Sequence, residues 1–400
     1  MKIKMPKDVE YIIDKIYKKG YEAFIVGGCV RDSIIGLKPN DYDITTNASP
    51  SQIINIFKGE RIIETGIKHG TVTLIKNKFE YEITTYRIDG EYNDNRRPEC
   101  VEFTSDIMKD LQRRDFTINA IAYNYKVGIV DIFGGIKDIQ AKLIKTVGEA
   151  HKRFEEDGLR IIRAVRFSCK LGFDIENNTN EGIYKNISLI KNVSLERIQE
   201  ELNKILMSDN PEKLYTLYDA GMFNELGIYD IKIQKNELNY IKDSKKDLIT
   251  RLTILIYIMG NTINSRNILN ILKYPNSVKN QCITILDYLN QDIDIDKTCI
   301  KLCLHKVGKE NFIQILNIKM VLEKQFANDK YEKILRLIKE IEEKNECYSL
   351  KTLAINGNDL KALGYNGKDV GLKLSCLLNR VIENSEINNK LKLMEILKDM

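Results

Sequence analysis

Apolar positions in the first part of the chain follow two different periods. Residues 8–19 carry apolar side chains at helical spacing, which predicts an amphipathic helix. The run EAFIVGG, residues 22–28, predicts a buried strand that ends in glycines, and VRDSIIG after it predicts a short helix. Residues 41–46 predict a second strand. Helix and strand signals therefore alternate from the start of the chain.

Cap and turn residues extend this alternation. Ser49 followed by Pro50 is typical of a helix start, because serine caps the free N–H groups and proline suits the first turn. Residues 69–77 and 78–88 alternate between apolar and polar side chains and are joined by a short turn, which predicts a hairpin.

The pattern changes at about Lys137. From there to Met400 we expect almost only helices, with short polar breaks between them. The segment 194–208, for example, opens with a serine cap and carries apolar residues at helical spacing. The fold class predicted is therefore α+β, with a mixed head followed by an all-helical remainder.

Composition narrows the class of protein. The chain has 400 residues, 43% of them hydrophobic, which suggests about two to four domains. We find no apolar run near the ~18–20 residues that a membrane-spanning helix needs, and no signal-peptide pattern at the start. We therefore expect a cytoplasmic protein without a membrane partner.

The net charge excludes no class of partner, but the cysteines and histidines argue against several kinds of metal site. The formal net charge of +5 permits a polyanionic partner without demanding one. The eight cysteines include no CxxC pair, so reduced and mostly buried thiols are expected. The three histidines, His69, His151 and His305, lie in unrelated contexts, which argues against a histidine-based metal centre.

Two aspartates one residue apart are the strongest chemical signal. In a strand, Asp41 and Asp43 point to the same face. Two such carboxylates can hold Mg²⁺, which prefers oxygen ligands. A polar strand end is the alternative interpretation of an isolated pair of this kind.

The glycines before this pair change the balance. Gly27 and Gly28 end a strand and open a helix, so backbone N–H groups can approach phosphate oxygens, and Arg31 adds a charged donor on the first turn. A dinucleotide-binding βαβ unit is excluded, because the chain has no GxGxxG here. Together these residues predict a phosphate cradle followed by a metal site.

Further motifs follow in a fixed order, and together they carry a resemblance. They are GGCVRD, DYDI, RRDFTINAIAYN, DIFGG, EDGLRIIRAVRF and ERIQEEL, with a weaker match in the tail over residues 353–374. In this order and spacing the chain resembles the class II tRNA nucleotidyltransferases, the bacterial CCA-adding enzymes of the polymerase-β-like nucleotidyltransferase superfamily. The match is strong over residues 20–205.

The resemblance implies an architecture. We expect a mixed β-sheet nucleotidyltransferase head, palm-like and catalytic, over residues 1–138. A helical neck for recognition of the nucleotide base would follow over 139–205, a helical body over 206–300 and a helical, tRNA-binding tail over 301–400.

The resemblance also implies roles in binding the incoming nucleotide. Arg114 and Asp115 would bind its ribose, with Asp115 accepting from the 2′-hydroxyl, and Asn119 would fix the backbone of this segment. A solvated charge cluster is the alternative for the Arg-Arg-Asp triplet alone.

The resemblance implies that the segment beginning near Phe154 recognises the base of the incoming nucleotide. We expect one helix in which Asp157 and Arg160 lie side by side at i and i+3. An acceptor beside a donor fits cytosine and adenine and rejects guanine and uracil. Glu156 would orient Arg160, and the two further arginines would reach the triphosphate. These are Arg163 and Arg166.

Several other residues have two readings. Glu82 is either a third catalytic carboxylate or an exposed strand residue. The polar segment GEYNDNRRPE, residues 90–99, resembles a flexible loop of the family that is thought to help the switch from C to A. Arg96 and Arg97 in it either touch substrate or are merely exposed. His69 is expected to be structural.

Two further motifs are expected to act through structure. DIFGG, with Asp131, Gly134 and Gly135, is either a hinge between head and neck or a plain turn. ERIQEEL is expected to brace the neck helices rather than to touch substrate, through Glu196, Arg197 and Glu200.

The function implied is stepwise addition of C, C and A to the 3′ end of tRNA from CTP and ATP. CC-adding and A-adding enzymes and bacterial poly(A) polymerase share this chemistry and remain alternatives. An RNA-binding protein with an inactive head is a rival of another class, and a nucleotidyltransferase for small molecules is disfavoured by the EDxxR motif and the long helical part. The oligomeric state stays open.

Overall fold

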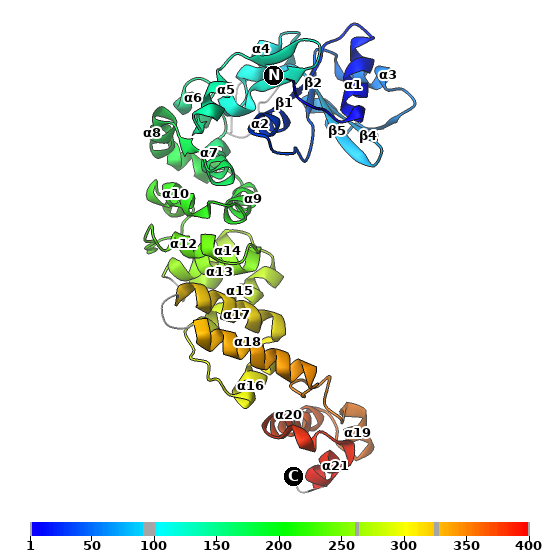
Figure 1. Cartoon of the computed structure of the whole chain (residues 1–400), viewed down its shortest axis with the longest axis vertical. Helices are drawn as coiled ribbons and strands as arrows, with labels where there is room; N and C mark the ends of the chain where they lie inside the picture. Colours follow the sequence, from blue (N-terminus) through cyan, green and yellow to red (C-terminus); the bar gives the residue numbers. More distant parts are fainter. Residues whose placement is uncertain (1, 91–100, 261–263, 324–327, 399–400) are drawn as a thin grey trace. The chain divides into compact units, whose positions relative to one another are not determined.

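The computed structural model describes residues 2–90, 101–260, 264–323 and 328–398. Its contacts divide the chain into two compact units, coloured along the sequence in Figure 1. Unit 1 is Met1–Asp230 with Ile271–Lys273, and unit 2 is Ile231–Asn270 with Tyr274–Met400. The finer division at residues 138, 205 and 300 stays a prediction.

A seven-stranded mixed sheet forms the core of the first part of unit 1, in the order β3-β4-β5-β2-β1-β8-β9. Its strands are β1 (Ala23–Val26), β2 (Ile44–Thr46), β3 (Arg61–Ile63), β4 (Thr71–Lys76), β5 (Phe79–Thr85), β8 (Ile121–Asn124) and β9 (Gly128–Asp131). Only the β2–β5 pair is parallel, and the other neighbours run antiparallel. The predicted mixed sheet is thereby confirmed.

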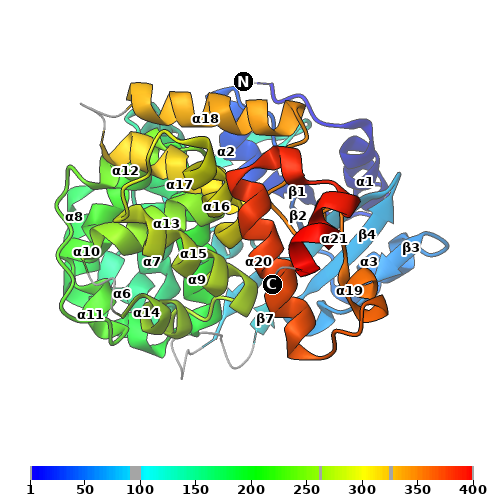
Figure 2. The ribbon, with the colours of Figure 1, turned by 90° about the horizontal axis from the view of Figure 1, so that it is seen from below.

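Helices pack against this sheet. They are α1 (Lys7–Tyr17), α2 (Gly28–Ile35), α3 (Pro50–Ile56), α4 (Ile107–Gln112) and α5 (Gly135–Gln140), with short 3₁₀ turns η1 (Ile67–His69) and η2 (Thr117–Asn119). Helices α1 and α3 lie beside the strands (Figure 1, Figure 2). Ser49 caps α3 in a full capping box, as its Ser-Pro start predicts. The predicted hairpin is β4–β5, and Asn77 and Lys78 turn it with positive φ angles of 50° and 69°.

Helices form nearly all of the rest of unit 1. They are α6 (Ala150–Glu156), α7 (Leu159–Leu171), α8 (Asn177–Asn186), α9 (Leu195–Leu206), α10 (Tyr215–Asp219) and α11 (Met222–Glu225), with 3₁₀ turns η3 (Ile187–Asn192) and η4 (Pro211–Leu214). Two short strands, β10 (Leu143–Ile144) and β11 (Asp174–Ile175), are an exception to the expected helical run. Ser194 stands at the start of α9 as expected, but its side chain makes no capping hydrogen bond.

Unit 2 is helical throughout its described part. Its helices are α12 (Leu238–Asp243), α13 (Leu248–Ile258), α14 (Ser265–Ile271), α15 (Asn276–Leu289), α16 (Lys297–Val307), α17 (Lys309–Leu322), α18 (Asn328–Glu343), α19 (Gly357–Ala362), α20 (Lys368–Glu383) and α21 (Lys390–Lys398), with a 3₁₀ turn η6 (Ser385–Ile387). A buried lysine, Lys301, ties α16 to Glu346 at 3.2 Å and to Ser385 at 2.9 Å. These contacts join the last helices to the others of the unit.

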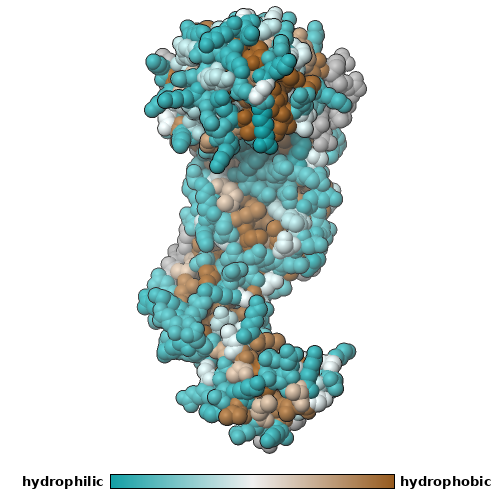
Figure 3. Space-filling view, turned by 90° about the vertical axis from the view of Figure 1, so that its right-hand side faces the viewer, coloured by the Kyte–Doolittle hydropathy of each residue, from teal (hydrophilic) through white to brown (hydrophobic). Residues whose placement is uncertain are grey.

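The surface is mixed rather than apolar. Hydrophilic residues cover most of the face drawn in Figure 3, with hydrophobic patches between them. Among the described residues, no helix is both long enough and apolar enough to cross a membrane. The seven cysteines of the described ranges are free thiols.

The DIFGG motif forms the turn between β9 and α5. Asp131 accepts hydrogen bonds from the backbone N–H groups of Gly135, at 2.7 Å, and Ile136, at 2.9 Å. Gly135 packs so closely that a Cβ atom would stand 2.2 Å from the carbonyl oxygen of Thr117. The motif therefore fastens η2 to α5, and a hinge role stays a prediction.

We predict that Gly135→Ala destabilises the protein by about 1–3 kcal/mol or more, because the added methyl group would push the backbone of η2 away. Thermal unfolding followed by circular dichroism measures the change as a lower Tm. Gly371→Ala is the control, since Gly371 lies in α20 and, outside its own helix backbone, no described atom lies within 4 Å of the added Cβ. An unchanged Tm in Gly135→Ala would contradict the packing seen here.

Candidate active site

The two aspartates lie just before β2, not within it. The expected strand over residues 41–46 is wrong at its start, since β2 begins at Ile44. The neighbouring strand β1 ends at Val26, whose N–H still donates to the Asp43 carbonyl at 3.0 Å. Beyond that point Gly27 turns the chain into α2, so Asp41 has no strand to pair with. Asp41 and Asp43 are both exposed on either side of the half-buried Tyr42.

The Asp43 carboxylate is reachable but poorly compensated. The Asp43 side chain is exposed to solvent, but the protein atoms around the carboxylate still desolvate it. This desolvation first, and then the negative charge of Asp41, raise its pKa to about 6; Glu82 acts in the same direction and Arg114 opposes them. The site therefore concentrates negative charge that a cation would relieve.

The fold brings Glu82 beside this pair, which the sequence left open. Parallel pairing of Ile44 with Ile83 places the preceding residues, Asp43 and Glu82, opposite each other on neighbouring chain segments. Glu82 is exposed. Within the described ranges, however, no three acidic, histidine or cysteine side chains are gathered closely enough to hold a metal ion. Glu82 as a third ligand stays a prediction.

The carboxylates fit a hard divalent cation. Asp41 and Asp43 offer oxygen donors, which Mg²⁺ prefers. The pKa of Asp43 is raised first by desolvation and then by the negative charge of Asp41, and a bound cation would offset both effects. This donor set and its charge thus match a magnesium site.

The glycine turn and Arg114 meet beside these carboxylates. Gly27 has a φ angle of 77°, and a Cβ atom on it would stand 3.1 Å from Nη1 of Arg114. Glycine is therefore required here both for the backbone angle and for the close approach. Gly28 begins α2 directly after it. Nε of Arg114 is buried without a hydrogen-bond partner among the described residues, so this side chain keeps donors to spare.

Arg31 lies deeper than a phosphate ligand would. It is only 3% exposed, and its guanidinium donates to Asp32 at 2.8 Å and to the side chain of Asn119 at 2.5 Å. It also lies 5.1 Å from the ring centre of Phe167. Arg31 therefore joins α2 to the segment that follows Asp115, and direct contact with phosphate stays a prediction.

Asp115 is the centre of a hydrogen-bond network. One oxygen accepts from the Phe116 N–H at 2.8 Å and from the Asn119 amide at 3.0 Å. The other accepts twice from Arg163, at 2.9 and 2.6 Å. Although burial alone would raise the pKa of Asp115, Arg163 and Asn119 hold it well below its ordinary value. Asn119 fixes this segment, as expected.

The segment that we expected to read the base is not one helix. We expected a helix from Phe154 through Arg160, but α6 ends at Glu156 and α7 begins at Leu159. Asp157 leaves helical geometry, with φ −149° and ψ 106°, and its carboxylate accepts from the Leu159 N–H at 3.0 Å.

Gly158 and Arg197 complete this break. A Cβ atom on Gly158 would stand 2.9 Å from the carbonyl oxygen of Leu189. The Asp157 carboxylate is also bound by Arg197 of α9, at 2.8 Å. Asp157 therefore lies at the entrance to α7 rather than on its side.

Arg160 is held as the sequence suggested. Its guanidinium pairs with Glu156, and it also donates to the backbone carbonyls of Arg153 and Arg113, each at 3.1 Å. The last contact ties α7 to the residue before Arg114. The expected donor and acceptor for a base edge are thus held by separate partners, Glu156 for Arg160 and Arg197 for Asp157.

Arg166 points into a buried ion pair. Its Nε lies 2.5 Å from Glu201 of α9, and its guanidinium lies 3.8 Å from the ring centre of Phe167. Contact of Arg166 with a triphosphate stays a prediction.

The sequence singled out the ERIQEEL motif but not its contacts. Arg197 and Glu201 are the residues that reach the site, whereas Glu200 is exposed. The near-complete burial of Glu201 could have been inferred from its place on the apolar face of α9. Residues 91–99 of the expected flexible loop, with Arg96 and Arg97, lie outside the described residues.

We predict that Asp115→Asn lowers stability at pH 7 by roughly 1–3 kcal/mol, because Arg163 loses its charged partner. The folded-state pKa of Asp115 is depressed, so this stability is present above the ordinary aspartate pKa and is lost as the pH falls below it. The Tm difference between wild type and variant should therefore narrow below about pH 4.

Asp174→Asn is the matched control for this prediction. Asp174 pairs with Lys213 at 2.8 Å, but its side chain is 84% exposed, so the loss should be small. A Tm difference for Asp115→Asn that persists unchanged in acid would show that the charge is not the cause.

Comparisons with known proteins identify the family of the chain. Three family models match successive parts of the chain: the Poly A polymerase head domain over residues 23–145, the RNA and SrmB-binding site of polymerase A over 172–227, and tRNA nucleotidyltransferase domain 2 over 244–397.

The relatives that match over nearly the whole chain include several CCA-adding enzymes. The chain is 37% identical to the CCA-adding enzyme of Staphylococcus haemolyticus over 95% of this chain and 93% of that protein. It is 34% identical to the CCA-adding enzyme of Geobacillus kaustophilus over the same shares. The crystal structure of the Bacillus stearothermophilus CCA-adding enzyme in complex with CTP matches with a TM-score of 0.83, 30% identity and 99% coverage of both chains. The chain therefore belongs to the CCA-adding enzymes, the class II tRNA nucleotidyltransferases.

Proposed function

We propose that this protein adds C, C and A stepwise to the 3′ end of tRNA, using CTP and ATP without a nucleic-acid template and releasing pyrophosphate. One geometric observation carries the proposal. Arg163 binds Asp115 and Arg160 binds the carbonyl of Arg113, so the expected base-reading segment is tied to the expected ribose-binding segment. The names of the relatives support it, since each is a CCA-adding enzyme.

The metal in this proposal is Mg²⁺, held by Asp41 and Asp43, with Glu82 as a candidate third ligand. When bound, it would activate the tRNA 3′-hydroxyl for attack on the α-phosphate and neutralise the leaving pyrophosphate. The protein supplies no nucleophile of its own. Its carboxylates must be ionised to bind a cation, so binding should weaken as the pH falls through the raised pKa of Asp43, which is about 6.

The protein's other groups orient the nucleotide. Gly27 and Gly28 let the start of α2 approach the phosphates. Arg114, with its spare donors, would bind the triphosphate or the ribose. Asp115 would accept a hydrogen bond from the 2′-hydroxyl through a lone pair that Arg163 does not use. These assignments set the nucleotide between α2 and the start of α7.

Base choice would follow from hydrogen-bond polarity. Cytosine and adenine both present an exocyclic amine beside a ring nitrogen that accepts. Asp157 can only accept and Arg160 can only donate, so the pair matches these two edges and opposes guanine and uracil. Because Glu156 and Arg197 hold the pair in place, no template is needed.

Transfer RNA is the proposed partner. Contacts of the helical part with its acceptor arm would be to phosphates and shape, and thus largely independent of sequence. We place the protein in the cytoplasm with its substrate. CC-adding, A-adding and poly(A)-adding activities use the same head chemistry and are separated by the following experiment.

We predict that the purified protein, given Mg²⁺, CTP and ATP, extends a tRNA transcript lacking CCA by two C residues and one A and then stops. Products are resolved at single-nucleotide length, with each nucleotide also supplied singly. A stop at CC, addition of A to a CC end only, or a long A tail would each identify one of the rivals.

Asp41→Ala should lower this activity by at least about 10²-fold, because a ligand of the catalytic cation is lost. Binding of tRNA, measured by filter retention, should remain. If the wild-type protein binds tRNA but incorporates nothing, the protein is an RNA-binding protein and the proposed activity is wrong.

We further predict that Asp157→Asn weakens discrimination against UTP by about 1–3 kcal/mol, since the asparagine amide can donate to the uracil carbonyl. The measurement is the ratio of kcat/KM for CTP and UTP on tRNA lacking CCA. Glu200→Gln, on exposed α9 surface, is the control and should leave the ratio unchanged. An unaltered ratio in Asp157→Asn would remove this residue from base selection.

A further inference from the structure

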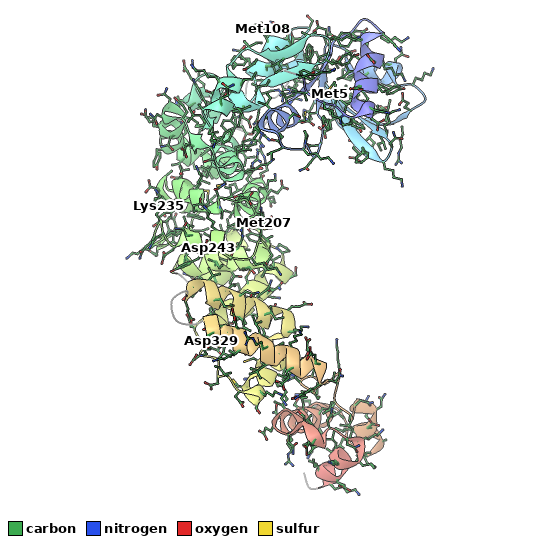
Figure 4. All side chains as sticks on the ribbon, viewed as in Figure 1. Met5, Met108, Met207, Lys235, Asp243 and Asp329 are labelled. Atoms are coloured by element: carbon green, nitrogen blue, oxygen red, sulfur yellow. The ribbon has the colours of Figure 1, made fainter. Side chains whose placement is uncertain are left out.

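One buried carboxylate beside the site has no role in the chemistry described so far. Asp110 lies in α4 and has no exposed surface. Two residues earlier on the same helix, Met108 is 51% exposed and is labelled in Figure 4, so α4 turns Asp110 inward. Burying an ionised carboxylate is costly unless it is paired. The residues that bind the Asp110 carboxylate therefore indicate its role.

Both oxygens of Asp110 are engaged by arginines of the Arg-Arg-Asp triplet. One accepts twice from Arg113, at 3.0 and 2.8 Å. The other accepts from Arg114 at 3.4 Å. Although burial alone would raise the pKa of Asp110, these two arginines keep it below its ordinary value, so the group is ionised at neutral pH.

The same carboxylate is fixed from two further directions. The hydroxyl of Thr45 donates to it at 3.3 Å, and Thr45 lies in β2, two residues after Asp43. The backbone N–H of Arg87, in β6 (Arg87–Asp89), donates at 3.4 Å. Asp110 therefore cannot move without disturbing β2, and Arg114 is anchored to the strand that directly follows Asp43.

Arg114 extends from this anchor to the site. Its Nη2 donates to Asp110. Its Nη1 faces the Gly27 turn, 3.1 Å from the place where a Cβ atom on Gly27 would stand. Its charge opposes the repulsion that Asp41 imposes on Asp43. Its Nε has no partner among the described residues. One end of the guanidinium is thus fixed and the rest is left for an anionic ligand.

We propose that Asp110 is a positioning residue for nucleotide binding: its buried carboxylate holds the Arg114 guanidinium over the Gly27 turn, ready for the triphosphate or ribose of CTP or ATP. The inference rests on the proposed function for the identity of the ligand. It assigns no contact between Asp110 and the substrate. Loss of the carboxylate should release Arg114, which would then have to be ordered when nucleotide binds, at the expense of affinity.

The test compares CTP binding by wild type, Asp110→Asn, Arg114→Ala and the double variant, using isothermal titration calorimetry in the presence of Mg²⁺. Asparagine keeps the shape of the side chain and removes the charge. We expect Asp110→Asn to weaken CTP binding by about 10-fold or more, because a charge-assisted contact is lost. We expect the double variant to bind within about twofold of Arg114→Ala alone, because Asp110 acts through that residue.

Glu60→Gln is the matched control. Glu60 also binds two cations, Lys15 at 2.5 Å and Lys76 at 3.4 Å, but it lies directly before β3, the edge strand of the sheet. It should leave CTP binding unchanged. The inference is overturned if Asp110→Asn binds CTP as well as Glu60→Gln does, or if the two losses multiply in the double variant, as a general weakening of the fold would require.

Circular dichroism and Tm establish that each variant is folded. If Asp110→Asn does not fold, Thr45→Val replaces it, since this variant removes one donor to the same carboxylate. A few-fold loss of CTP affinity that disappears in the Arg114→Ala background would support the inference, and unchanged affinity would overturn it.

Nucleotide addition to tRNA lacking CCA is measured in parallel. A wild-type protein that binds CTP but adds nothing would refute the proposed function, while the binding comparison would still decide the role of Asp110. A wild-type protein that binds no CTP would refute both.

Discussion

The ion pair between Arg163 and Asp115 is the contact on which the arrangement of the site depends. It joins residues 48 positions apart in the chain and brings α7 against the segment that carries Arg114. The pair is largely buried on the aspartate side, where the side chain is 10% exposed. Breaking such a pair would leave one charge without its partner, so the ion pair holds the two segments together. Phe167, packed beside Arg31, Arg163 and Arg166, supports the same junction.

Charge is distributed unevenly around this junction. The arginines described above pair with carboxylates, whereas Asp41 raises the pKa of Asp43 and Arg114 opposes that effect. Such unbalanced charge costs stability in the free protein and is typical of sites that bind a cation or an ionised substrate. The structure thus combines a scaffold of paired charges with the less compensated carboxylates Asp41 and Asp43, and Asp110 binds Arg114 beside them.

The break between α6 and α7 determines where Asp157 lies. A continuous helix would have placed Asp157 on the side of the helix with all of its backbone partners satisfied within it. Instead, Asp157 leaves helical geometry at the entrance to α7, where Arg197 of α9 can bind it. Gly158 allows the backbone to approach Leu189. Residues from two helices therefore hold an acceptor and a donor that the sequence alone placed on a single helix.

Local patterns by themselves determined the mixed head, the helical remainder, the β4–β5 hairpin and the motifs that identify the family, because hydrophobic period and turn residues act over a few positions. They also predicted the Glu156–Arg160 pair, whose spacing of four is set by the helix. Only the tertiary structure decided that β2 begins after Asp43, that Glu82 lies opposite it, and that Arg31 is buried. These features depend on where β1 ends and which strands pair. Such contacts join residues far apart in the chain, and no local pattern encodes them.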